Sequence, residues 1–172
     1  MAVATAMPKA VPDLGGMRLY ALPFSAYFTT SLFGLVLAGE ICDRRGPRLP
    51  LVGGTASFTA GLLLAGSAQS MVPFVLGRAV QGLGGGIVIV AVYVLVGRAY
   101  DDNLRPRMFA ALSAAWVVPS IVGPLIAGFL ADQLSWRLVF LGIAPLAVVP
   151  VLIALPSVIR YDGPPPAGPN VR

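Results

Sequence analysis

Histidine is absent from the 172 residues, and cysteine occurs only once, at Cys42. Without histidine the chain lacks the usual zinc ligand and the side chain that most often serves as general base at neutral pH. A single cysteine excludes an internal disulfide and a cysteine-based metal cluster. We therefore expect no metal site and no catalytic residues, which argues against an enzyme.

Charged residues are also scarce, at 11% of the chain, whereas soluble domains carry about 25%. Hydrophobic residues make up 57%, and the mean hydropathy is +0.84. One soluble core of this size could not bury so much apolar surface, so the composition predicts a lipid bilayer as partner. The isoelectric point near 10.0 does not indicate nucleic-acid binding, because the basic residues form short clusters between apolar runs.

Five apolar runs are each close to the length of about 20 residues that a membrane-spanning helix needs. They cover residues 20–41, 51–68, 72–96, 109–130 and 138–159. Prolines mark their borders, at Pro47, Pro50, Pro73 and Pro106. The sequence thus predicts an all-α, polytopic membrane helix bundle over residues 1–161. Residues 162–172, rich in proline and glycine, are expected to form a disordered, solvated tail.

The distribution of basic residues predicts the orientation, because lysine and arginine are retained on the cytoplasmic side. One set of alternate loops contains eight: Arg44, Arg45, Arg48, Arg98, Arg105, Arg107, Arg160 and Arg172. The other set contains three, Lys9, Arg18 and Arg137, and Arg78 lies inside a span. This asymmetry predicts a multi-pass protein of the plasma (inner) membrane with a cytoplasmic C-terminus.

An internal repeat relates residues 34–49 to residues 123–138. Six positions are identical at a constant offset of 89, among them Asp43 with Asp132 and Arg48 with Arg137. Three spans separate the copies, so the second copy must be inverted, as in many secondary transporters. Chance among glycine and alanine residues is the alternative, but it explains the shared Asp and Arg poorly. The offset also makes residues 1–8 the last turns of a first helix that lies mostly upstream.

Three segments carry polar or helix-breaking residues where the spans alone would not require them. The first, residues 39–48, joins two spans and contains Asp43 beside arginines, with Gly46 permitting a sharp reversal; a plain basic turn is the alternative. In the second, Arg78, Gln81 and Gly82 share one helical face, although Arg78, about 9 Å into its span, could also snorkel outward.

The third segment, residues 119–128, places Pro124 inside a span, where it should kink the helix. Pro119, Gly123 and Ala127 recur every four residues and permit close approach of a second helix. Packing alone would account for this stripe equally well.

These segments resemble three ordered motifs of the major facilitator superfamily. The first is similar to the loop motif G-x-L-A-D-R-x-G-R-K, with Pro47 replacing one basic residue; its matching positions are Gly39, Asp43, Arg44, Gly46 and Arg48. The second is similar to R-x-x-Q-G of the fourth helix, matched by Arg78, Gln81 and Gly82. The third resembles G-x-x-x-G-P-x-x-G-G of drug:proton antiporters, matched by Gly123, Pro124 and Gly128, with Pro119 and Ala127 in place of glycines.

The resemblance implies the N-terminal half of a transporter that works by alternating access. Its expected function is proton-coupled export of small amphipathic compounds, with protons as the coupling ion and no cofactor. The first segment would control switching between states, the second would serve proton coupling, and the third would shape the helix associated with export. A second six-helix half is expected, in the full-length chain or as a separate or identical subunit.

Two alternatives stay open at this point. An importer of sugars or other metabolites would share the fold, although the glycine-proline segment argues against it. A truncated membrane remnant that does not transport would also fit, because one helix and one half are expected to lie outside the chain.

Overall fold

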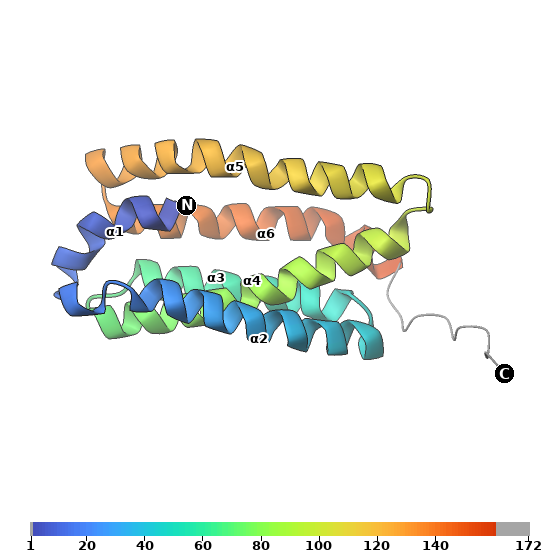
Figure 1. The fold of residues 1–172 in the computed structure, drawn as a ribbon, viewed down its shortest axis with the longest axis horizontal. Coiled ribbons are helices and arrows are strands. Elements are labelled where there is room, and N and C mark those ends of the chain that lie inside the picture. Colours follow the sequence, from blue (N-terminus) through green and yellow to red (C-terminus); the bar gives the residue numbers. More distant parts are fainter. Residues whose placement is uncertain (1, 161–172) are drawn as a thin grey trace.

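The computed structural model describes residues 2–160, and the regular elements in that range are all helical. A short α1 (Ala2–Asp13) and a 3-10 turn, η1 (Met17–Leu19), precede five long helices. These are α2 (Leu22–Arg45), α3 (Arg48–Gly66), α4 (Met71–Ala99), α5 (Arg105–Gln133) and α6 (Trp136–Arg160). Figure 1 shows them side by side along one common direction. The predicted all-α bundle is confirmed, while the predicted tail, residues 162–172, lies outside the described residues.

Each of the five long helices is apolar and long enough to cross a membrane, which confirms the five predicted spans. Two helices nevertheless begin at least three residues earlier than predicted: α3 starts at Arg48 and takes Pro50 into its first turn, and α5 starts at Arg105 with Pro106 next. The reason is that the first four N–H groups of a helix have no intrahelical acceptor, so proline costs nothing there. Arginine and proline therefore mark the ends of the apolar runs in the sequence, but the helices extend past them.

The N-terminal helix is longer than the stub predicted for residues 1–8. α1 continues through Pro8 to Asp13, because Met7, Ala10 and Val11 are fully buried in a core shared with α5 and α6. Tertiary packing of this face offsets the hydrogen bond that Pro8 removes.

The helix borders follow the inverted repeat that the sequence predicts. α2 ends at Arg45 and α5 at Gln133, while α3 begins at Arg48 and α6 at Trp136; both pairs differ by 88, within one residue of the predicted 89. In Figure 1, α2 and α5 run in opposite directions, and their following turns lie at opposite ends of the bundle. An inverted copy requires this arrangement.

Glycines let α4 pack tightly between α2 and α3. A Cβ on Gly82 or Gly86 would collide with backbone oxygens of α2, and a Cβ on Gly77 or Gly84 would collide with the backbone of α3. Side-chain hydroxyls add bonds across both contacts: Thr30 Oγ1 lies 2.7 Å from the carbonyl oxygen of Ala79. Small residues permit such close backbone approach, which is how membrane helices gain packing energy without a hydrophobic effect.

The largest core among the described residues lies at one end of the bundle, where α1, α3, α4, α5 and α6 meet. Phe74, Trp136 and Phe140 pack edge to face there, with ring centroids 5.4–6.1 Å apart. Trp136 Nε1 donates to Asp13 Oδ2 at 2.9 Å, which ties the end of α1 to the start of α6. Arg137 donates to the carbonyl oxygen of Ala68 at 2.7 Å and so caps the chain just after α3. The opposite end has a much smaller core around Cys42 and Leu51.

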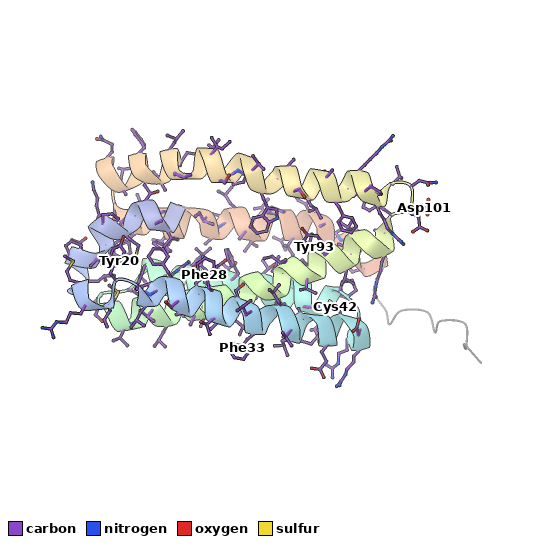
Figure 2. All side chains as sticks on the ribbon, viewed as in Figure 1. Tyr20, Phe28, Phe33, Cys42, Tyr93 and Asp101 are labelled. Atoms are coloured by element: carbon purple, nitrogen blue, oxygen red, sulfur yellow. The ribbon has the colours of Figure 1, made fainter. Side chains whose placement is uncertain are left out.

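Large apolar side chains also cover the outer surface. Phe33 is 68% exposed and points away from the bundle (Figure 2), and Val36 on the same helix is 77% exposed. Among the described side chains of α5, only Ala127 and Ala131 are buried. A helix bundle that is apolar inside and outside is stable only in lipid, so the fold defines a multi-pass membrane protein.

Matched alanine substitutions on α4 test the glycine packing. Gly86→Ala should destabilise the bundle by roughly 1–3 kcal/mol, because its methyl group would overlap the carbonyl oxygen of Ser31. Gly97→Ala is the control, since a Cβ there meets nothing within 4 Å and alanine favours helix. Thermal unfolding of the detergent-solubilised chain measures both. Equal melting temperatures for the two variants would contradict the close contact.

The arrangement of the loops predicts labelling from opposite sides of the membrane. The α3–α4 turn holds Gln69 and the α4–α5 turn holds Asp102, both exposed and separated by the length of α4. Single cysteines at these positions, in a Cys42→Ser background, should react with an impermeant reagent from different sides. Reaction of both in intact cells would show that α4 does not span the bilayer.

Candidate functional site

The charged group buried most deeply among the described residues is the guanidinium of Arg78. Its side chain is 5% exposed, in the second turn of α4, and Gln81 one turn further is 4% exposed. Arg78 Nη1 donates to Gln81 Oε1, so the predicted common face is confirmed. The side chain stays inside the bundle and does not snorkel toward the end of the span.

Tyr27 on α2 forms the other side of this site. The Arg78 Cζ atom lies 4.3 Å from the centroid of the Tyr27 ring, within the range of a cation–π contact. Gly82 makes the contact possible, because any Cβ at that position would collide with the backbone oxygen of Tyr27 and with Thr30 Oγ1. The three residues of the R-x-x-Q-G segment thus have different roles. Arg78 is the cation, Gln81 accepts its hydrogen bond, and Gly82 leaves the space that α2 occupies.

One donor of this cation is unsatisfied. Within the described part of the chain, Arg78 Nε is buried and has no hydrogen-bond acceptor. A buried, unpaired donor on a charged group is costly, particularly in a membrane. The site therefore has unused capacity to bind an anionic or polar group.

The α2–α3 turn at the other end of the bundle is built around Gly46. Its φ of +82° and ψ of 173° are accessible essentially to glycine alone, and its N–H donates to the carbonyl oxygen of Cys42 at 3.0 Å. The sharp reversal predicted for Gly46 is confirmed. At position 39, by contrast, the structure does not require glycine, since a Cβ there would meet nothing within 4 Å.

The charged side chains near this turn are exposed, and two of them form an ion pair. The ion pair seen here connects Arg44 to Glu40, at 2.7 Å and one helical turn apart, and both side chains are largely exposed. Asp43 and Arg48 are also exposed. Arg98 reaches the turn from α4: its Nη2 donates to the carbonyl oxygen of Cys42 at 3.2 Å, which fixes the end of α2 against α4.

The glycine-proline segment of α5 is mostly free of contacts with other helices. Pro119 is exposed, Gly123 and Pro124 are half-buried, and a Cβ on Gly123 would meet nothing within 4 Å. Gly128 is closer to a neighbour, because its Cβ would lie 3.4 Å from Thr5 of α1. Within the described residues, the predicted close approach therefore occurs only at the end of the stripe near Ala127.

The three segments do not form one cluster. Arg78 lies near the start of α4, the α2–α3 turn lies at the opposite end, and α5 runs along another side of the bundle (Figure 1). Figure 2 shows Cys42 and Asp101 toward the same end of the bundle, apart from each other.

Sequence reasoning missed two partners, Tyr27 and Arg98. Tyr27 stands 51 positions before Arg78 and belongs to no motif, so only the packing of α2 on α4 reveals it. Arg98 was assigned to a loop because it is charged, yet it lies within α4.

These features define a membrane-embedded α-helical bundle of the inverted-repeat kind, with a buried cation in its interior. The chain belongs to the Major Facilitator Superfamily, which it matches over residues 1–171. Members of this family are membrane transporters for small molecules and not enzymes.

Several relatives carry names of drug transporters. The chain is 33% identical over 150 residues to the multidrug transporter protein MdtP of Bacillus subtilis, covering 87% of this chain and 28% of that protein. It is 30% identical to multidrug resistance protein 3 of the same species, with 92% and 30% covered. The multidrug efflux pump SdrM of Staphylococcus aureus is 24% identical, with 89% and 34% covered. The chain thus spans about a third or less of the length of these relatives.

Substitution of Tyr27 tests the cation–π contact. Tyr27→Leu should destabilise the chain by about 1–2 kcal/mol, because the desolvated guanidinium loses its aromatic face, whereas Tyr27→Phe should retain most of the stability. Phe33→Leu is the control, since Phe33 is 68% exposed and points away from the bundle (Figure 2). Thermal unfolding in detergent measures all three. If Tyr27→Phe loses as much as Tyr27→Leu, the hydroxyl group and not the ring supports Arg78.

Proposed function

We propose that this chain forms half of a proton-coupled exporter of small amphipathic compounds. Family membership supports transport, and the names of the relatives support export of drugs. The single observation that carries the coupling role is the buried Arg78 with its unsatisfied Nε. No bond in the substrate is made or broken, and protons are the coupling ion.

Arg78 would act as a fixed positive charge inside the transport pathway. Holding it there costs about 2.5–3.5 kcal/mol even on lenient insertion scales, so a compensating interaction is required. Gln81 and the Tyr27 ring supply part of this compensation, and Gly82 admits that ring. The remaining donor is suited to a carboxylate that releases its proton when it binds the cation, or to an anionic group of the substrate.

The α2–α3 turn would control the change between outward-open and inward-open states. Gly46 fixes its shape, while Asp43, Arg44 and Arg48 present charges on the exposed side of the turn. Gly39 leaves room beside them. Exposed charges around an open glycine position are suited to a reversible contact with another part of a transporter.

That other part would be a second six-helix half, in the full-length chain or as a separate or identical subunit. The relatives are about three or more times longer than the match, which supports a larger assembly. α5, with Gly123 open and Pro119 exposed, is suited to face the transport pathway near that half and to favour export. The basic turns would face the cytoplasm, as would the C-terminus, in the plasma membrane.

Two other functions are less well supported. An importer of sugars or other metabolites would use the same fold, but the relatives named for their function are named for drug efflux or resistance. A membrane remnant without transport would have no use for a buried cation that costs insertion energy.

The test is Arg78→Lys in the complete transporter, with both halves present. Lysine retains the charge but lacks the planar fork that binds Gln81 and a carboxylate together. We expect normal insertion and loss of proton-driven efflux, measured as accumulation of a fluorescent drug across a range of external pH. Arg107→Lys, at an exposed position, is the control and should transport normally. Full efflux by Arg78→Lys at matched expression would refute the coupling role.

A further inference from the structure

An open groove lies beside the α2–α3 turn, on the side where α3 packs against the end of α6. It has a volume of about 510 Å³ and is lined by Arg45, Arg48, Leu49, Val52 and Leu155. Nothing in the proposed transport mechanism uses Arg45, Val52 or Leu155. The groove therefore adjoins the proposed switch turn through Arg48, while its other lining residues have no part in the proposed transport mechanism.

The lining changes from charged to apolar with depth in the membrane. Arg45 ends α2 and Arg48 begins α3, so both guanidinium groups lie at the membrane surface, where the span starts. Val52 lies one turn further along α3, about 6 Å deeper. Leu49 and Val52 are 50% and 42% exposed, and together with Leu155 of α6 they present an aliphatic wall below the arginines.

Among the described residues, the charged side chains that line the groove are all basic. Both of its charged lining residues are arginines, while the carboxylate of Glu40 lines a neighbouring groove and is paired with Arg44 at 2.7 Å. Asp43 lies on the same turn but does not line this groove. A guanidinium has five N–H donors, so each arginine can bind an external anion in addition to any contact within the protein.

We propose that this groove binds one anionic phospholipid from the surrounding leaflet. The phosphate would lie between Arg45 and Arg48, and an acyl chain would cover Leu49, Val52 and Leu155. Basic pockets between membrane helices at the cytoplasmic surface are suited to such head groups, and arginine binds phosphate through two parallel hydrogen bonds. The aliphatic wall below the arginines argues for a lipid in preference to free phosphate, which would leave that wall exposed.

Lipid retention by the full chain tests the proposal. The chain is placed in nanodiscs of phosphatidylcholine mixed with phosphatidylglycerol, released into detergent, and analysed by native mass spectrometry for bound lipid. Wild type should retain phosphatidylglycerol selectively. The double variant R45Q/R48Q should lower its affinity about thirtyfold, because each arginine close to an anionic lipid contributes roughly a fivefold factor.

The matched control is R105Q/R107Q, which removes two arginines from the same end of the bundle but outside the groove. It should change the affinity by less than about threefold, because exposed charges that do not touch the head group are screened by salt. Equal losses in both double variants would mean a general surface charge and would overturn the site. Equal retention of phosphatidylcholine and phosphatidylglycerol by the wild-type chain would also overturn the proposed site.

Competition on the wild-type protein separates a lipid site from a phosphate site without any variant. Soluble glycerol phosphate lacks acyl chains and should not displace bound phosphatidylglycerol. Displacement at concentrations comparable to those of the lipid would show that the arginines bind phosphate alone, and the lipid proposal would fail.

Discussion

The close approach of α2 to α4 is the constraint on which the interior of this protein depends. Gly82 and Gly86 remove the side chains that would hold the two backbones apart, and the approach then places the Tyr27 ring over Arg78. Without that ring, Gln81 would be the one partner left to the guanidinium among the described residues, in a medium that solvates charge poorly. The same glycines therefore have two effects: they allow α2 and α4 to pack closely, and they allow the Tyr27 ring to stabilise the buried cation.

A second consequence concerns where the bundle is rigid. α2, α3 and α4 interlock through backbone contacts, and α1 and α6 meet α3 and α4 in the aromatic core at one end. α5 buries only two alanines among its described side chains and contacts mainly α1 and α6. Since backbone-to-backbone packing leaves no room for sliding, motion in the proposed transport cycle is expected to spare the three-helix unit. α5 is the helix with the greatest freedom to change neighbours.

Much of this fold could be predicted because a membrane reduces the problem to apolar length and the positions of charges. The five spans, the repeat offset and the reversal at Gly46 followed from those features. Helix borders were wrong by several residues, since Arg48 and Pro50 interrupt an apolar run yet fit the first turn of a helix. The extent of α1 was underestimated for a related reason: Met7 and Val11 gain from tertiary contacts with α5 and α6 that no local pattern reports.

The partners of the polar residues were the least predictable part. The Arg78–Gln81 bond is local in sequence, so helical periodicity sufficed, whereas Tyr27 and Arg98 act across helices. Arg98 shows why charge alone misleads in such chains: it lies at the end that the orientation rule predicts to be cytoplasmic, yet it also donates to the carbonyl oxygen of Cys42 in the last turn of α2. A basic residue at a helix end can set topology and cap a neighbouring helix together, because the carbonyl groups at a helix C-terminus attract a cation wherever it comes from. Arg137 plays a similar part at the opposite end of the bundle, where it donates to the carbonyl oxygen of Ala68 just after α3. The repeat pairs Arg137 with Arg48 and not with Arg98, so the two capping contacts arise independently of the repeat.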